Sequence, residues 1–201
     1  MKLTEPPSTK ERLLSAARDH YLEVGTVHFS LREVARRTDV TAAAIYRHFD
    51  SKEALLAEVC NEGFRVFGGY LLAALAKKGP RERMRAALDQ YLKFSVERPR
   101  DYRVIFMSEP VDRRLVRPPD DASPDPSFTF LVDRVRECQE HKLVLRGDPH
   151  ELALSIWAHL HGLVSLRIAG LLGAEGEDLT RFSALYHTST ERLLHGLAPR
   201  A

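Results

Sequence analysis

Apolar residues recur at a helical spacing along almost the whole chain. Within residues 8 to 24, for example, Leu13, Leu14, Ala17 and Tyr21 fall on one face of a helix. Alternating runs of β-branched residues long enough to build a sheet are missing from the sequence. The pattern therefore predicts an all-α fold.

The first fifty residues contain start signals for three short helices. Ser8 with Glu11, and Ser30 with Glu33, match the S-x-x-E capping box, and Thr41 is a third candidate N-cap. Residues 38 to 40 leave a turn of three or four residues between the second and third helices. That length is typical of a helix-turn-helix.

A long helix is predicted over residues 51 to 78, capped by Asp50 or Ser51 and ended by Gly79 and Pro80. At about 1.5 Å per residue it would be roughly 40 Å long, too long for a fifty-residue head alone. We therefore expect a head in residues 1–50 and a helical bundle in residues 51–201, with about nine helices in all. The bundle helices are predicted over residues 81 to 97, 101 to 108, 128 to 142, 149 to 172 and 178 to 196, with a proline-rich acidic loop over 116 to 127.

Composition adds few constraints. The chain has 201 residues and a formal net charge of +2, so overall charge neither indicates nor excludes a nucleic-acid partner. Cys60 and Cys138 form no CxxC pair and predict neither a disulfide framework nor a zinc ribbon. Because the sequence has no apolar h-region and no run of about 18 apolar residues, we expect a cytoplasmic protein with no membrane partner.

The third predicted helix combines a small-residue start with a polar end. In a helix-turn-helix, the N-terminal part of the second helix meets base edges in the major groove, where an alanine methyl can contact a thymine methyl. Ile45 and Phe49 would anchor this helix to its neighbours. The pattern predicts base contacts from Thr41, Ala42 and Ala43, and phosphate contacts from Tyr46, Arg47, His48 and Lys52.

The net positive charge around this helix is small, because Glu33 and Asp39 offset part of the arginine charge. Taken alone, Arg36 and Arg37 are better explained as the solvated face of a helix, and the caps and the turn are what favour DNA binding. We therefore expect binding to depend on uncharged donors and on two heads acting together.

Residues 29 to 56, FSLREVARRTDVTAAAIYRHFDSKEALL, closely resemble the DNA-binding head of the TetR family of one-component transcriptional regulators. The resemblance includes the Y-x-H-F ending and the following S-K-E-x-L-L. It implies a dimer with a ligand-binding C-terminal domain, and it makes Ser30 and Arg32 candidate phosphate neighbours beside the contacts named above. The family usually has glycine in the turn where this chain has Asp39, a residue type that tolerates left-handed backbone.

A second, shorter resemblance lies in the bundle. Trp157, His161 and Gly162 match the W-x-x-x-H-G pattern of a TetR subgroup named for a Trp-His-Gly signature. Trp157 and His161 are four residues apart and share a helical face. Two interpretations stay open: they line a small-molecule cavity, or they are a core tryptophan and a satisfied core histidine. Further candidate walls are Phe64, Phe67, Tyr91, Phe94, Phe106 and Phe130.

The last two long helices are candidates for pairing with a second copy of the chain. Small residues such as Gly162 permit close helix approach, and larger ones such as Phe182 and Tyr186 would supply burial, although packing within one chain would look similar. His187 and His195 share a face with Glu191, but they lie about 12 Å apart along the helix, too far to share one ion. We predict no metal and no other cofactor.

Together these features predict a homodimeric, ligand-responsive regulator of transcription that binds double-stranded DNA. We expect a repressor, released from a palindromic operator when a small-molecule effector enters the bundle. An enzyme is disfavoured, since the sequence shows no nucleophile beside a base, no paired ExxH motif and no glycine-rich phosphate loop. A helical adaptor for proteins would not need three capped helices with phosphate donors at their tips.

Overall fold

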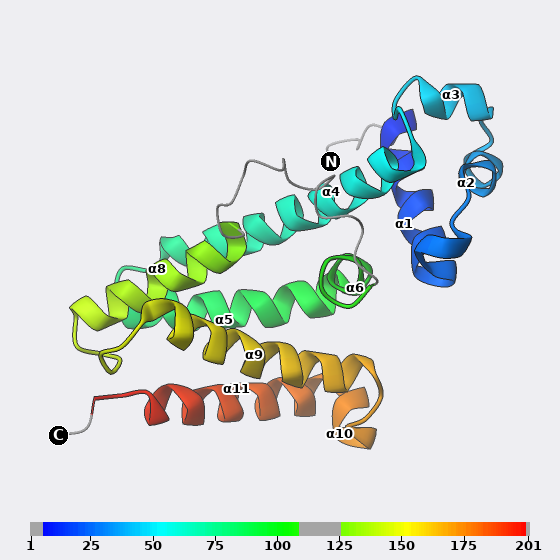
Figure 1. The fold of residues 1–201 in the computed structure, drawn as a ribbon. Coiled ribbons are helices and arrows are strands. Elements are labelled where there is room, and N and C mark those ends of the chain that lie inside the picture. Colours follow the sequence, from blue (N-terminus) through cyan, green and yellow to red (C-terminus); the bar gives the residue numbers. More distant parts are fainter. Residues whose placement is uncertain (1–5, 109–125, 200–201) are drawn as a thin grey trace. The chain divides into compact units, whose positions relative to one another are not determined.

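A computed structural model describes residues 6–108 and 126–199 (Figure 1). The described residues form ten α-helices and one 3-10 turn, and they contain no strand. The all-α prediction is therefore confirmed. Of the predicted loop over 116 to 127, residues 116–125 lie outside the described residues, and a helix already begins at Pro126.

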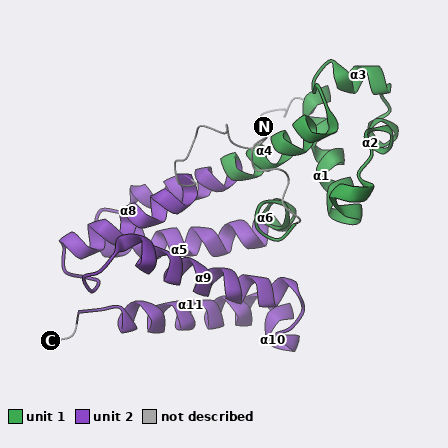
Figure 2. Ribbon diagram, viewed as in Figure 1, with its two compact units in different colours: residues 1–65, 98–122 green, residues 66–97, 123–201 purple. Residues whose placement is uncertain are grey.

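The chain divides into two compact units (Figure 2). The first combines residues 1–65 with 98–122, and the second combines residues 66–97 with 123–201. The functional division at residue 50 remains a prediction, because compactness assigns no function. Unit 1 contains α1 (Thr9–His28), α2 (Leu31–Thr38), α3 (Ala42–Tyr46), the first part of α4 (Lys52–Ala73) and α6 (Pro99–Phe106). Unit 2 contains the rest of α4, a 3-10 turn (Ala74–Ala76), α5 (Pro80–Glu97), α8 (Pro126–Glu140), α9 (Pro149–Ile168), α10 (Gly173–Glu177) and α11 (Leu179–Gly196).

Capping residues set the helix starts in unit 1. The Ser8 backbone N–H donates to Glu11 at 2.7 Å and the Glu11 N–H donates to the Ser8 hydroxyl at 3.3 Å, so the first capping box is confirmed. Thr41 caps α3 by accepting from the Ala44 N–H at 3.2 Å. Asp39 adopts the left-handed backbone that the turn requires, with φ 54° and ψ 47°.

The predicted capping box at the start of α2 is wrong. Ser30 is the N-cap, but its side chain makes no capping hydrogen bond. The Glu33 carboxylate instead accepts hydrogen bonds from Arg36 and Arg37. Two guanidinium groups within reach compete with the backbone for the same oxygens, and charge-assisted hydrogen bonds are the stronger kind.

One core joins the helices of unit 1. Leu13, Val34, Ile45 and Leu55, from four different helices, are each 0% exposed and belong to one hydrophobic cluster. Burying an aliphatic side chain of this size contributes roughly 1.5–3 kcal/mol. The short α3 is therefore held through Ile45.

Helix α6 is attached to α1 by a buried carboxylate. Asp101, only 3% exposed, accepts from Arg18 of α1 at 2.6 Å and from Arg98 at 2.6 Å. On its other side α6 lies against Gly63 of α4, where an added Cβ would be 2.7 Å from Ile105. The backbone of α4 and the side chain of Ile105 thus pack without intervening atoms.

In unit 2, two helices end several residues before the predicted position. The α-helical part of α4 ends at Ala73, with a 3-10 turn to Ala76, and α9 ends at Ile168 instead of residue 172. Gly170 explains the second case, since its φ of 73° is left-handed and its N–H donates back to the Arg167 carbonyl. Helix α10 was not predicted, because its GAEGE sequence is rich in glycine, a poor helix former.

Of the two alternatives that the sequence left open for Phe182 and Tyr186, the structure shows packing within the chain. Both are 0% exposed within the single chain, and the Tyr186 hydroxyl donates to the Leu88 carbonyl of α5 at 2.8 Å. Aromatic residues at helical spacing identify a buried face without saying which helix covers it.

We expect Asp101→Asn to lower the free energy of unfolding by about 3 kcal/mol, because it leaves the Arg18 and Arg98 guanidinium groups without their buried counter-charge. Asp19→Asn is the matched control, since Asp19 forms an exposed pair with Arg100 and should cost less than about 1 kcal/mol. Urea unfolding followed by circular dichroism measures both. Equal losses in the two variants would contradict the structural role given to Asp101.

Candidate DNA-binding surface and effector cluster

The segment from Thr41 to Phe49 exposes one set of side chains and buries another. Tyr46 is 56% exposed, whereas Ile45 is 0% and Phe49 is 6% exposed. Ala44 is buried together with Ile45. The exposed set consists of Thr41, Ala42, Ala43, Tyr46, Arg47 and His48.

This arrangement presents small groups first and polar groups afterwards. Thr41, Ala42 and Ala43 lie at the N-terminal end of α3, and Tyr46 is its last residue. Arg47 and His48 follow in the turn, where the His48 N–H donates to the Ile45 carbonyl. An exposed helix start without bulky side chains can approach a base edge closely, and the donors after it match phosphate oxygens.

The arginines of α2 are largely committed to acidic neighbours. Arg37 pairs with Glu23 at 2.5 Å and with Glu33 at 2.8 Å, and Arg36 pairs with Glu33 at 2.7 Å. Hydrogen bonds from Arg36 and Arg37 lower the pKa of Glu33 to about 2. These contacts favour the interpretation that Arg36 and Arg37 serve the head itself.

The remaining predicted phosphate contacts differ in whether their side chains already have a partner within the protein. The Lys52 ammonium donates to the Thr26 carbonyl at 2.8 Å and lies 5.8 Å from the centre of the Phe29 ring. Arg32 and Arg47 are exposed and form no ion pair within the described part of the chain. Ser30, at the start of α2, is half-buried.

Unit 2 brings several of the predicted effector residues together. The Tyr91 hydroxyl of α5 lies 3.2 Å from Nδ1 of His161 on α9. The Trp157 ring is 6.0 Å from that imidazole, and the Phe128 ring is 6.1 Å from the indole. Burial lowers the pKa of His161, which favours the neutral ring. Phe67 packs beside Tyr91 at 5.7 Å.

We call Phe67, Tyr91, Phe94, Phe128, Trp157 and His161 the aromatic cluster. Phe94 joins it through Phe67, with ring centres 4.9 Å apart. Phe128 was missed because the predicted helix began at that residue, although its neighbours in sequence point to a helix start two residues earlier, at Pro126.

The other three predicted wall residues have different neighbours within their own units. Phe64 and Phe106 pack edge to face in unit 1, with ring centres 6.1 Å apart, and Tyr102 lies beside Phe106. Phe130 lies on α8 under the guanidinium of Arg134 at 4.9 Å. The predicted wall residues are thus shared between the two units, a division that sequence spacing alone does not show.

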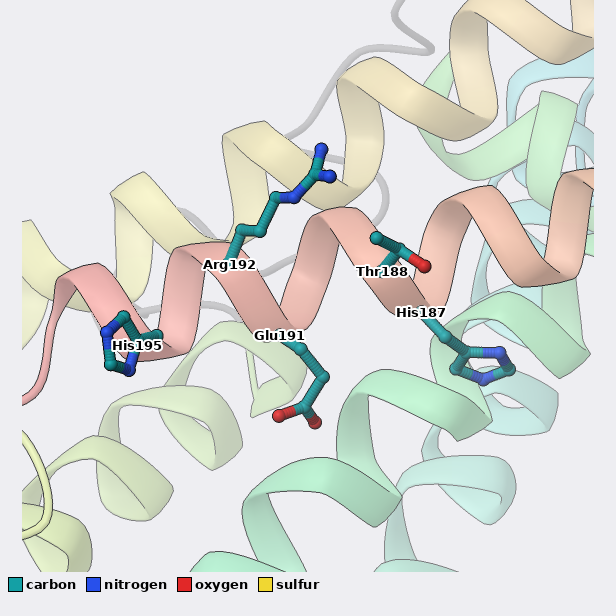
Figure 3. Close-up of a pocket in the computed structure, with 5 residues that line it drawn as sticks. All are labelled: His187, Thr188, Glu191, Arg192 and His195. Atoms are coloured by element: carbon teal, nitrogen blue, oxygen red, sulfur yellow. The ribbon is translucent and has the colours of Figure 1, made fainter.

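An open hollow of about 560 Å³ lies along α11, lined by His187, Thr188, Glu191, Arg192 and His195 (Figure 3). His187 and Glu191 extend from one side of the helix, and Arg192 extends from the other. His187 bonds to Asp89 at 3.1 Å and Glu191 pairs with Arg85 at 2.6 Å, both on α5. These two side chains therefore help to join α11 to α5.

The two cysteines and the hydropathy of the helices give two separate findings. Burial raises the pKa of Cys60 to about 11, and it raises the pKa of Cys138 to about 11 as well, so neither thiol is activated as a nucleophile. Among the described helices, none combines the length and apolarity needed to cross a membrane.

Comparisons with known proteins agree with this geometry. Residues 13–59 match the family described as bacterial regulatory proteins of the tetR family, and residues 84–188, which include Trp157, His161 and Gly162, match the tetracyclin repressor-like C-terminal domain. An HTH-type transcriptional activator from Mycolicibacterium smegmatis is 28% identical over 65% of this chain, which spans 62% of that relative. An HTH-type transcriptional repressor from Mycobacterium tuberculosis is 26% identical over 83% of this chain and 80% of its own length.

Solved structures show the same fold. A regulatory protein of the tetR family from Rhodococcus RHA1 superposes with a TM-score of 0.72 at 16% identity, covering 98% of this chain and 100% of that one. The fatty acid degradation regulator FadR from Bacillus halodurans gives 0.74 at 15% identity, covering 92% and 98%. Because the head and the C-terminal domain both match, the second over more than half of the sequence, this chain belongs to the TetR family of transcriptional regulators, which bind DNA through the helix-turn-helix head.

Proposed function

We propose that this protein is a homodimeric repressor, released from a palindromic operator when a small molecule binds the aromatic cluster of unit 2. The observation that carries the proposal is the division of residues 41–49 into an exposed polar and small-residue set above a buried anchor of Ala44, Ile45 and Phe49. We further propose that it acts in the cytoplasm and catalyses no reaction.

On DNA, Thr41, Ala42 and Ala43 contact base edges in the major groove. Tyr46 and His48 donate to phosphates, which positions the helix without reading sequence. The remaining phosphate contacts come from Ser30, Arg32, Arg47 and Lys52, and Lys52 must exchange its bond to the Thr26 carbonyl for one to a phosphate.

A second copy of the chain is needed because α3 is only five residues long and reads few base pairs. The surface of α9 and α11 supports self-association. Four exposed leucines lie on or between these helices, and a Cβ added at Gly162 would meet no atom within 4 Å. The four are Leu154, Leu166, Leu171 and Leu179.

Effector binding acts by favouring one dimer arrangement over another. A ligand shifts such an equilibrium only through its different affinity for the two states. Helix α4 contributes residues to both units, and α6 is fixed to α1 through Asp101. These two helices carry the change to the heads, so that the two copies of α3 no longer fit successive major grooves.

Tyr46→Ala tests the DNA contacts. It should weaken binding to a labelled duplex from the gene's own upstream region by roughly tenfold, because a hydrogen bond to a charged phosphate is lost. Binding to a random duplex should weaken similarly, and fluorescence anisotropy at several salt concentrations measures both. Tyr70→Phe, which alters a tyrosine of unit 2 bonded to Glu97, is the control. Unchanged affinity in Tyr46→Ala would refute the assignment.

Leu166→Arg tests the second copy. Leu166 is 41% exposed on α9, and a guanidinium there should separate the chains and abolish tight operator binding. Leu72→Arg, at a leucine of α4 that is 61% exposed, is the matched control and should leave the mass unchanged. Light scattering after size-exclusion chromatography reports the mass. A dimer that survives Leu166→Arg places the interface elsewhere.

Trp157 is the only tryptophan of the chain and reports directly on the effector site. A compound that releases DNA in a small-molecule screen should also change the tryptophan fluorescence. His161→Ala should raise the concentration needed for release by about tenfold, through the loss of one polar contact, with DNA affinity unchanged. Release with unchanged fluorescence and unchanged potency would show that the effector binds outside the aromatic cluster.

A further inference from the structure

His20 is a buried titratable residue in the middle of the DNA-binding head. It lies on α1 and is 5% exposed. Its Nε2 accepts a hydrogen bond from the Ser30 backbone N–H at 3.2 Å, and its ring lies 5.3 Å from that of Phe29. Its Nδ1 is buried and has no hydrogen-bond partner among the described residues.

This hydrogen bond replaces the capping box that is missing from α2. An N-cap residue's own N–H lies outside the helical ladder, and in a capping box a Glu side chain three residues later accepts from it. Here the Glu33 carboxylate is taken by Arg36 and Arg37. The imidazole of His20 supplies the acceptor instead, so the start of α2 depends on a side chain that can accept only in its neutral form.

Only the neutral imidazole can make this contact. A histidine nitrogen accepts a hydrogen bond when it carries no proton, whereas both nitrogens are donors in the protonated ring. Protonation at Nε2 would place an N–H against the N–H of Ser30. The bond would be lost, and a charge would be buried beside Phe29.

The surroundings favour the neutral ring. Burial is the main cause of a lowered His20 pKa, and the positive charge of Arg37 on α2 adds to it. Glu33 of α2 and Glu23 of α1 act in the opposite direction. From α4, the Lys52 ammonium lies over the Phe29 ring that packs on His20.

The same contact holds residues that are predicted to touch DNA. Ser30 is the residue bonded to His20, and Arg32 lies in the first turn of the helix that Ser30 begins. Lys52 holds the other end of the 26–30 segment through the Thr26 carbonyl. Loss of the His20 bond therefore frees the segment between two proposed phosphate contacts.

We propose that His20 is a positioning residue for DNA binding: its neutral imidazole fixes Ser30 at the start of α2, and protonation breaks that bond and weakens the hold on DNA. This inference rests on the proposed function, since it assigns a proton-sensitive control to the same DNA-binding surface.

The direction of the pH effect follows from linkage. A histidine whose folded pKa is depressed stabilises the native head above the unfolded pKa of about 6.5, and that contribution is lost as the pH falls through the folded value. DNA affinity should therefore fall by up to about tenfold per pH unit below the pKa of His20 in the free protein. Groups other than His20 are the same in wild type and in a His20 variant, so the difference between the two pH profiles isolates the contribution of His20.

The test uses the full-length protein and a labelled duplex from the gene's own upstream region, between pH 8 and pH 5.5 at constant ionic strength. His20→Gln keeps an acceptor near the position of Nε2 but does not titrate. His28→Gln is the matched control, because His28 is an exposed histidine at the end of the same helix. Wild type and His28→Gln should lose affinity as the pH falls, and His20→Gln should lose at least threefold less over this range.

Binding at pH 8 with the same pH profile in wild type and His20→Gln would overturn the inference and leave the proposed function intact. Absence of binding by all three proteins at pH 8 would overturn the proposed function itself. If His20→Gln does not fold, NMR of the wild type decides: exchange of the Ser30 amide should accelerate with the same midpoint as the titration of His20. A Ser30 amide that stays protected while His20 titrates would overturn the inference.

Discussion

The candidate DNA-binding surface depends on the burial of Ile45, which lies on the inner face of α3. A helix of five residues has almost no stability of its own, because nucleation costs more than its few hydrogen bonds return. Ile45 and Phe49 fix it to the core of unit 1, and the Thr41 cap and the left-handed Asp39 set where it begins. With its inner face held in this way, the residues between the anchors can only point outward.

Acidic side chains in the head bind several of its arginines, and these ion pairs affect how much positive charge faces DNA. Glu33 is bound by two arginines, so it neither caps α2 nor leaves Arg36 and Arg37 available to phosphates. Fewer positive charges of the head are then free of an acidic partner, so in the proposed contact with DNA more of the affinity must come from neutral donors such as Tyr46. Affinity that rests on few charges per head gains most from two heads on one duplex, since the second contact is then intramolecular.

Much of the head could be predicted because its signals are local. A cap and a turn each involve residues within five positions, and the exposed and buried residues of α3 follow from the 3.6-residue period. The Ser30–Glu33 box failed because a motif does not show which of several donors takes a carboxylate. Long-range packing was harder to predict, because the sequence did not show that Phe182 and Tyr186 are fully buried within the single chain. Periodicity identifies an apolar face, but the partner of that face is a property of the whole fold.

Hydroxyl-radical footprinting of the gene's own upstream region with the wild-type protein tests the central claim most directly. A paired, outward-facing α3 predicts two protected half-sites related by a twofold axis, with centres about one helical turn or a multiple of it apart. Protection should also weaken steeply with added salt. A single asymmetric patch, or no protection at low salt, would contradict the account.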